Sequence, residues 1–107
     1  MDLNVATEFY RRPLGRDRSQ GTYTGEAFRD DVLIKKINSL APNEKLYIDF
    51  TGVTMSGSSF LEEAFGGLVR KCGFKKDYLK KILVFNFPRR PSLESKVWSY
   101  INDALTD

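Results

Sequence analysis

The chain has 107 residues, of which 41% are hydrophobic and 29% charged, and its formal net charge is +3. This composition excludes a disordered chain, and the single cysteine excludes an internal disulfide framework. No apolar run reaches the roughly 20 residues that span a bilayer, and the N-terminus carries no secretory signal pattern. We therefore expect one domain over residues 1–107, without a membrane segment and located in the cytoplasm.

Histidine is absent from the chain. This removes the usual general base, the usual partner of a nucleophilic serine or cysteine, and the commonest metal ligand. The sequence also contains no glycine loop of the phosphate-cradling type and no cluster of metal-ligand residues. We predict that the protein is not an enzyme and needs no cofactor or metal.

The first half of the chain predicts a strand, a polar connection and a helix. Apolar and polar residues alternate over 3–9, which indicates a half-buried strand. A polar connection over 11–21 then leads to a short second strand near Thr22. Thr24 is a suitable N-cap for the helix that follows, and Pro42 ends this helix.

The second half repeats the alternation of strand and helix. A strand over 46–50 precedes a helix that ends at Gly73. A lysine-rich segment then leads into the apolar strand 82–87, which we expect to be covered on both faces. Ser92 caps a last helix. Strands that alternate with helices predict a largely parallel sheet with helices packed against it.

Two adjacent serines open the helix after the second predicted strand. A strand, a turn from Gly52 to Gly57 and a helix N-terminus place Ser58 and Ser59 at the carboxyl edge of the sheet, where open α/β folds present working groups. Ser59 and Glu62 have the spacing of a capping box, which leaves Ser58 in the exposed loop. Both serines are candidate phosphoacceptors, because a helix N-terminus favours phosphate.

Three further residues near this helix have two interpretations each. Gly66 and Gly67 each cost the helix about 1 kcal/mol relative to Ala, so either the sheet or a partner approaches closely there. The apolar stripe of the helix leaves Gly67 on the outer side, which favours a partner. Asp49, near the end of an apolar strand, either stabilises the loop that leads to the two serines (the serine loop) or acts as a catalytic or phosphate-site carboxylate. We predict a partner-binding surface made of Thr54, Met55, Ser56, Gly57, Glu62, Glu63 and Gly67.

The segments GTYTGEAFRDDVL and DFTGVTMSGSSFLEEAFGGLVRK resemble the STAS-like domains, and the run GSSFLEEAFGGLVR is similar to the hallmark of a small bacterial STAS-like family of unassigned function. The resemblance implies an α/β fold with a mixed, mostly parallel sheet of four or five strands and about three helices. It also implies a regulatory, protein-binding module similar to the anti-sigma-factor antagonists. In those proteins a GHKL-type ATPase phosphorylates a hydroxyl in an Asp-Ser-Ser/Thr-Gly stretch. Here both serines are kept, but Gly57 replaces the acidic residue and Phe60 replaces the glycine.

The basic residues suggest an alternative function. Residues 70–90 carry eight basic residues against one acidic residue, and a second cluster lies within 11–18. Such clusters attract nucleic acid, although aromatic residues suited to base stacking are not interleaved with these charges. The alternative is therefore a nucleic-acid-binding domain that uses the 70–90 segment, weakly and without sequence preference. The oligomeric state stays open.

Overall fold

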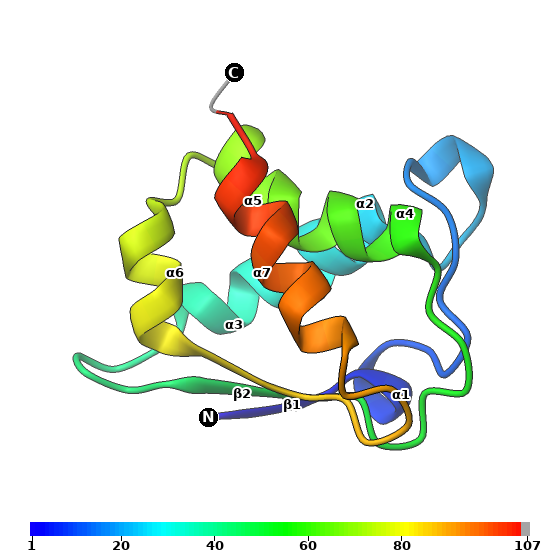
Figure 1. The fold of residues 1–107 in the computed structure, drawn as a ribbon, viewed down its shortest axis with the longest axis horizontal. Helices are drawn as coiled ribbons and strands as arrows, with labels where there is room; N and C mark the ends of the chain where they lie inside the picture. Colours follow the sequence, from blue (N-terminus) through cyan, green and yellow to red (C-terminus); the bar gives the residue numbers. More distant parts are fainter. Residues whose placement is uncertain (106–107) are drawn as a thin grey trace.

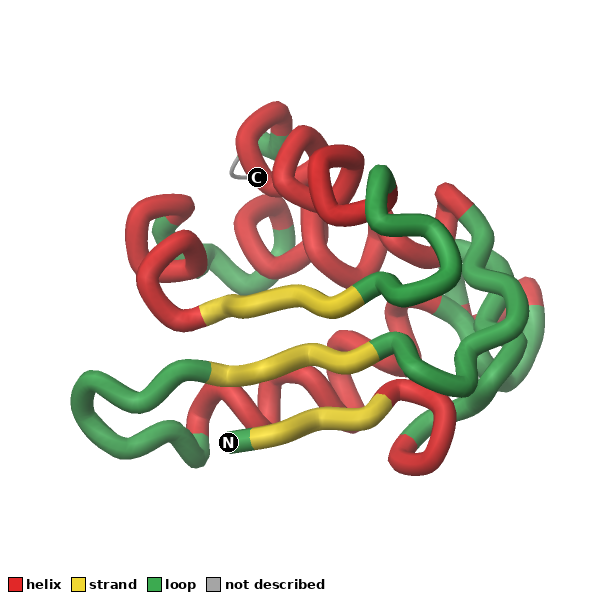
Figure 2. Tube along the Cα trace, turned by 60° about the horizontal axis from the view of Figure 1, so that its bottom comes forward, coloured by secondary structure: helices red, strands yellow, loops and turns green. Residues whose placement is uncertain are grey.

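The computed structural model describes residues 1–105, and its three strands form one parallel sheet. Strands β1 (Asp2–Asn4), β2 (Leu46–Asp49) and β3 (Leu83–Asn86) lie side by side in that order (Figure 2). Each pair is parallel. The prediction of a mixed sheet with four or five strands is wrong for this part of the chain, whereas the α/β class and the parallel pairing are confirmed.

The first strand ends earlier than the alternating pattern predicts. Helix α1 (Val5–Glu8) begins directly after β1, because the side chain of Asn4 accepts a hydrogen bond from the backbone N–H of Thr7 at 2.9 Å. This is an N-cap contact, which starts a helix. Val5 and Phe9 are four residues apart, so they fit one helix face as well as one strand face. The second predicted strand near Thr22 is also absent from residues 1–105, where a short 3-10 turn, η1 (Arg18–Gln20), precedes this position.

Two long helices follow β1 and β2. The first is continuous over 25–38 and consists of α2 (Gly25–Phe28), the π-helical η2 (Arg29–Leu33) and α3 (Ile34–Asn38). The second is continuous over 58–70 and consists of α4 (Ser58–Leu61), the π-helical η3 (Glu62–Gly66) and α5 (Gly67–Arg70). We call them the 25–38 helix and the 58–70 helix. Thr24 caps the first, as predicted, because its hydroxyl accepts the N–H of Ala27 at 3.3 Å.

Two further helices flank β3. Helix α6 (Lys76–Ile82) precedes it and was not predicted, because only Leu79 and Ile82 are buried among its lysines. Helix α7 (Leu93–Asp103) follows β3, and Ser92 precedes it as predicted but makes no side-chain capping hydrogen bond. With each continuous helix counted once, residues 1–105 contain five helices besides η1, not about three. No helix in this part of the chain is long and apolar enough to cross a membrane.

The 25–38 helix and the 58–70 helix lie on one side of the sheet, and so do α6 and α7 (Figure 1). Alternate strand residues point into the core between the layers, where Phe28, Phe60 and Phe65 are fully buried. The opposite strand residues are exposed or partly exposed, and Val84 and Asn86 of β3 are among the exposed ones. The prediction that strand 82–87 is covered on both faces is therefore wrong, because every described helix that packs on this sheet approaches it from the same side.

Candidate interaction site at the carboxyl edge of the sheet

The loops that follow β2 and β3 border an open cleft of about 320 Å³. Thr54, Met55 and Ser56 line it on one side, and Arg89 and Arg90 line it on the other. Phe50 and Phe87 form part of its wall, with stacked rings 4.3 Å apart. The cleft lies at the carboxyl ends of the parallel strands, where open α/β folds place their binding sites.

Asp49 anchors the loop after β2. Its carboxylate accepts hydrogen bonds from the hydroxyl and the backbone N–H of Thr51, at 2.7 and 2.9 Å, and from the side chain of Asn86 at 3.0 Å. The bonds from Thr51, which outweigh the effect of burial, lower the pKa of Asp49 below its ordinary value. Of the two interpretations of Asp49, the contacts support stabilisation of the serine loop.

The two serines lie in the first turn of the 58–70 helix. Gly57 is the N-cap, with φ −74° and ψ 153°, and no side chain caps this end. Ser58 and Ser59 are therefore the first two helical residues, and both are exposed. The predicted capping box of Ser59 and Glu62 is wrong, because the N-cap is Gly57, two residues before Ser59, and the helix begins at Ser58. The expected exposure of Ser58 is confirmed, but Ser58 belongs to the helix rather than to the loop.

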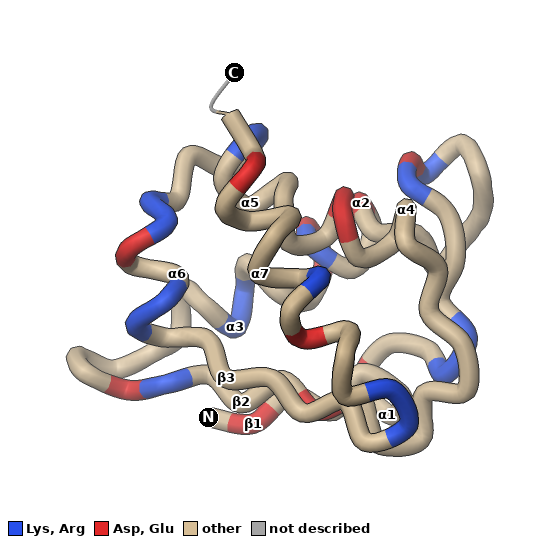
Figure 3. Tube along the Cα trace, viewed as in Figure 1, with Lys and Arg blue, Asp and Glu red and all other residues tan. Residues whose placement is uncertain are grey.

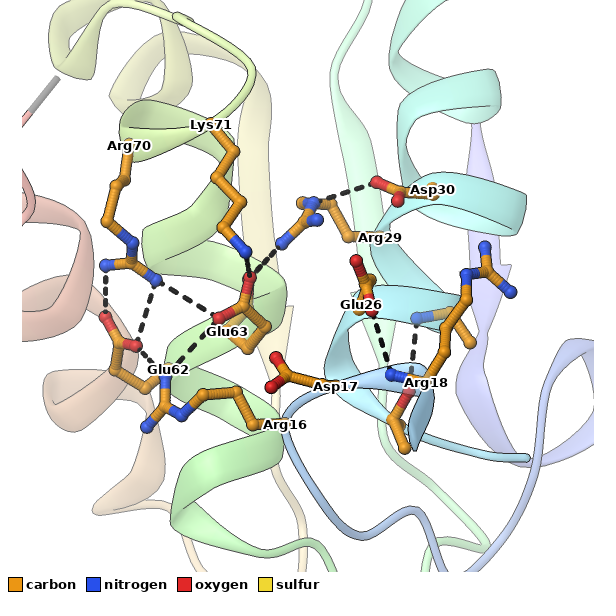
Figure 4. Close-up of polar contacts among 12 residues, drawn as sticks. Arg16, Asp17, Arg18, Glu26, Arg29, Asp30, Glu62, Glu63, Arg70 and Lys71 are labelled. Atoms are coloured by element: carbon orange, nitrogen blue, oxygen red, sulfur yellow. Dashed lines mark hydrogen bonds and ion pairs between the residues drawn. The ribbon is translucent and has the colours of Figure 1, made fainter. Parts of the chain in front are cut away.

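A buried ion pair joins the two long helices. The side chains of Arg29 and Glu63 are 3% and 2% exposed, and Arg29 Nη1 donates to Glu63 Oε2 at 2.5 Å and to the Glu63 backbone carbonyl at 2.9 Å (Figure 4). Arg29 Nε also donates to Asp30 at 2.9 Å. Burial alone would raise the pKa of Glu63, but hydrogen bonds from Arg29 and Lys71 outweigh it and lower that pKa. Arg29 and Glu63 both lie in the π-helical segments, which often mark functional positions.

Further cations extend this pair into a network at the protein surface. Arg70 forms hydrogen bonds to both oxygens of Glu62 at 2.9 and 3.1 Å, and Lys71 lies 3.3 Å from Glu63. Arg16 comes from the segment before the 25–38 helix and pairs with Glu62 and, at 3.5 Å, with Glu63 (Figure 4). The prediction that Glu63 is a surface residue that contacts a partner is wrong, because four cations surround the two carboxylates and the Glu63 side chain is buried.

Gly66 and Gly67 are close-approach positions between helices. Both are buried. A Cβ atom on Gly67 would lie 3.2 Å from Cζ of Arg29, and one on Gly66 would lie 3.3 Å from the backbone carbonyl oxygen of Tyr100 in α7. The prediction that Gly67 lies on the outer side is wrong. At Gly67 the space of a side chain is occupied by Arg29 of the 25–38 helix, and at Gly66 it is occupied by Glu62 and by helix α7. In neither case is the neighbour the sheet or a partner.

The sequence did not predict the roles of Arg16, Arg29, Arg70 and Lys71. One signal was present, since Arg29 lies four residues before the buried Leu33 and therefore on an apolar helix face. An arginine on such a face needs a buried carboxylate, and Glu63 lies beside the apolar stripe of the other helix. Nothing in the sequence spacing pairs these two positions, which are 34 residues apart.

The segment after α1 runs along the serine loop. The backbone N–H of Thr54 donates to the carbonyl of Arg11 at 2.8 Å, and that of Gly57 to the carbonyl of Pro13 at 3.4 Å. Leu14 is half exposed, and its side chain is so close to Gly57 that an added Cβ would lie 2.9 Å from it. We call residues 11–16 the strap. It holds the loop 54–57 at two backbone contacts and reaches the ion network through Arg16.

The predicted partner-binding residues thus separate into two groups. Thr54, Met55, Ser56 and Gly57 continue into the exposed serines and form one surface beside the cleft. Glu62 is only partly exposed and bound by arginines, and Glu63 and Gly67 face the neighbouring helix.

The basic residues of segment 70–90 do not form one patch (Figure 3). Arg70 and Lys71 belong to the ion network, and the lysines of α6 lie at the amino end of β3. Arg89 and Arg90 lie beyond its carboxyl end, beside the cleft. Among the described residues, no group of three or more Cys, Asp or Glu side chains is arranged to hold a metal.

The sequence of residues 24–87 matches the family described as a STAS-like domain of unknown function (DUF4325). The chain belongs to this STAS-like family. The matched region extends from the Thr24 cap to the end of β3, so it includes both long helices, the ion pair and the serine loop. The family assignment made from the sequence is confirmed. Comparisons with curated proteins and with solved structures found no match.

Proposed function

We propose that this STAS-like domain is a non-enzymatic interaction module that binds a regulatory protein partner at the carboxyl edge of its sheet. The observation that carries the proposal is the pair of exposed hydroxyls, Ser58 and Ser59, on the first helical turn beside an open cleft. The cleft supplies apolar contact through Met55 and positive charge through Arg89 and Arg90. A partner that contacts all of these groups would cover the serines as well.

Phosphorylation of one serine would switch this contact. No side chain caps the helix at Gly57, so the first backbone N–H groups are free to bind phosphate oxygens, and the helix dipole favours negative charge there. Residues three apart on a helix are neighbours, so a phosphate on Ser59 would lie near Glu62. It would compete with Glu62 for Arg16, which is 39% exposed, and so alter the position of the strap. By the family resemblance, the enzyme that adds the phosphate would be a GHKL-type ATPase.

Nucleic-acid binding is the weaker proposal. Its binding surface would have to combine α6 with the loop after β3, and these lie at opposite ends of that strand. Phosphate contacts need basic side chains that follow one continuous backbone.

The interaction proposal is tested by affinity capture from the native lysate, with bound proteins and phosphosites identified by mass spectrometry. Met55→Asp places a charge in the cleft, and Leu105→Asp is the matched control, because Leu105 is 78% exposed near the end of the chain. We expect a protein that the wild type and Leu105→Asp capture and Met55→Asp does not, together with a phosphosite at Ser58 or Ser59. Equal capture by Met55→Asp would exclude the carboxyl edge as the binding surface.

A further inference from the structure

Within residues 1–105, no layer covers one face of the parallel sheet. Parallel sheets are almost always covered on both faces. Here the 25–38 helix and the 58–70 helix lie on the same side as α6 and α7 (Figure 1). The strand register aligns the outward residues in two rows across the sheet. One row is Asp2, Tyr47 and Val84, and the other is Asn4, Asp49 and Asn86. We call this surface the open face.

The two rows differ in how their side chains are used. In the second row, Asn86 donates to Asp49, and Asn4 binds the carbonyl of Thr51 and caps α1. In the first row, Tyr47 is 49% exposed and Val84 is 37% exposed. The Asp2 carboxylate makes no hydrogen bond or ion pair with any residue in 1–105. The first row is therefore the part of the face that lacks partners.

The charge and the shape of the open face limit what can cover it. A hollow of about 370 Å³ runs over it, and its nine lining residues include two aspartates and no lysine or arginine, although the chain as a whole has a net charge of +3. Hydrogen bonds from Thr51 lower the pKa of Asp49, so its carboxylate stays charged near neutral pH. An occupant must therefore combine an apolar centre with positive charge. A second copy would bring two surfaces together that each carry aspartates and no lysine or arginine.

The area of the open face matches the area that a single bound helix covers. Four residues of strand extend about 13 Å, and three strands at a spacing of about 4.8 Å give a similar width. One α-helix, about 10 Å in diameter, covers that area with two to three turns. A globular partner would need an interface of about 800 Å² on each side, which is several times larger.

We propose that the open face binds an amphipathic, cationic helix of a partner protein. Apolar residues of that helix would pack on Tyr47 and Val84, and a lysine or arginine beside them would pair with Asp2. This surface is separate from the cleft at the carboxyl edge, so either site can exist without the other.

The test uses a synthetic helical peptide of about 14 residues, built from leucine and lysine with the 3.6-residue period, and a matched peptide of leucine and glutamate. Binding is followed by NMR shifts of the backbone amides. We expect the leucine–lysine peptide to shift Asp2, Tyr47 and Val84 with micromolar affinity, and the leucine–glutamate peptide to leave them unchanged. Val84→Ser should weaken binding about tenfold, because it removes the apolar contact. Met55→Ser, at the carboxyl edge, is the control that should bind like the wild type.

Charge reversal gives the decisive result. Asp2→Lys should lower the affinity for the leucine–lysine peptide and raise it for the leucine–glutamate peptide. The proposal is overturned if the peptide shifts residues away from the open face, or if Asp2→Lys leaves the preference unchanged. It is also overturned if sedimentation shows a wild-type dimer that Val84→Ser dissociates, because a second copy would then be the occupant.

Discussion

Gly67→Ala tests how the two long helices are held together. Gly67 is buried, and a methyl group there would lie 3.2 and 3.3 Å from Cζ and Cδ of Arg29, and closer still to Nη1. On an exposed helix the same substitution would stabilise by about 1 kcal/mol. Here the guanidinium has to move, and its bonds to the carboxylate and carbonyl of Glu63 and to Asp30 resist that movement.

The expected magnitude follows from the competing effects. Overpacking a well-packed site costs about 1 to 3 kcal/mol, and breaking a buried ion pair costs about 3 to 5 kcal/mol. Because Gly67→Ala displaces Arg29 without removing it, the cost should lie between the two ranges, at about 3 kcal/mol. The gain of about 1 kcal/mol in helix propensity leaves a net loss of about 2 kcal/mol in the free energy of unfolding. Urea denaturation followed by circular dichroism measures this loss.

A double-mutant cycle separates the clash with Arg29 from other causes. In an Arg29→Ala background the guanidinium is absent, so Gly67→Ala should cost much less than it does in the wild type. An unchanged or increased stability of Gly67→Ala alone would refute the contact between Gly67 and a fixed Arg29. An equal cost in both backgrounds would place the clash elsewhere.

Four other substitutions test separate parts of the structure. Gly25→Ala should lower the free energy of unfolding by about 3 kcal/mol, because its Cβ would lie 2.5 Å from the backbone oxygen of Phe60, which cannot rotate away. A free energy of unfolding within about 1 kcal/mol of the wild-type value would contradict this. Ser58→Ala and Ser59→Ala should each change the stability by less than about 0.5 kcal/mol in urea melts, because neither side chain caps the helix, and a loss near 1 kcal/mol for either would restore a capping role. The lowered pKa of Glu63 contributes stability that is present above the ordinary glutamate value of 4.5 and is lost as the pH falls through the lower folded pKa. As the pH is lowered, the melting temperature of Glu63→Gln should therefore fall less steeply than that of the wild type. Parallel curves would show that Glu63 is not the group whose protonation is coupled to unfolding.

Local signals in the sequence were sufficient for several parts of this protein. Thr24 caps the 25–38 helix, Gly73 follows the 58–70 helix with φ +74°, and the exposure of Ser58 was expected. These features depend on hydrogen bonds and backbone angles within a few residues, so the residue type is enough to predict them. The family could be recognised for a similar reason, because its hallmark is one continuous run.

Other features depended on contacts between distant segments. The pattern of residues 3–9 fits a strand or a helix, and only residues 2–4 pair with the distant strand β2 before the helix begins. Which side of a strand is exposed depends on where the helices pack, so the open face could not be seen in the apolar run of β3. Glu63 and Gly67 looked like surface positions because their helix was considered alone. Only the tertiary structure brings Arg29, which lies 34 residues before Glu63 in the sequence, next to both of them. The buried arginine needs the carboxylate of Glu63 as a partner and the missing side chain of Gly67 for space.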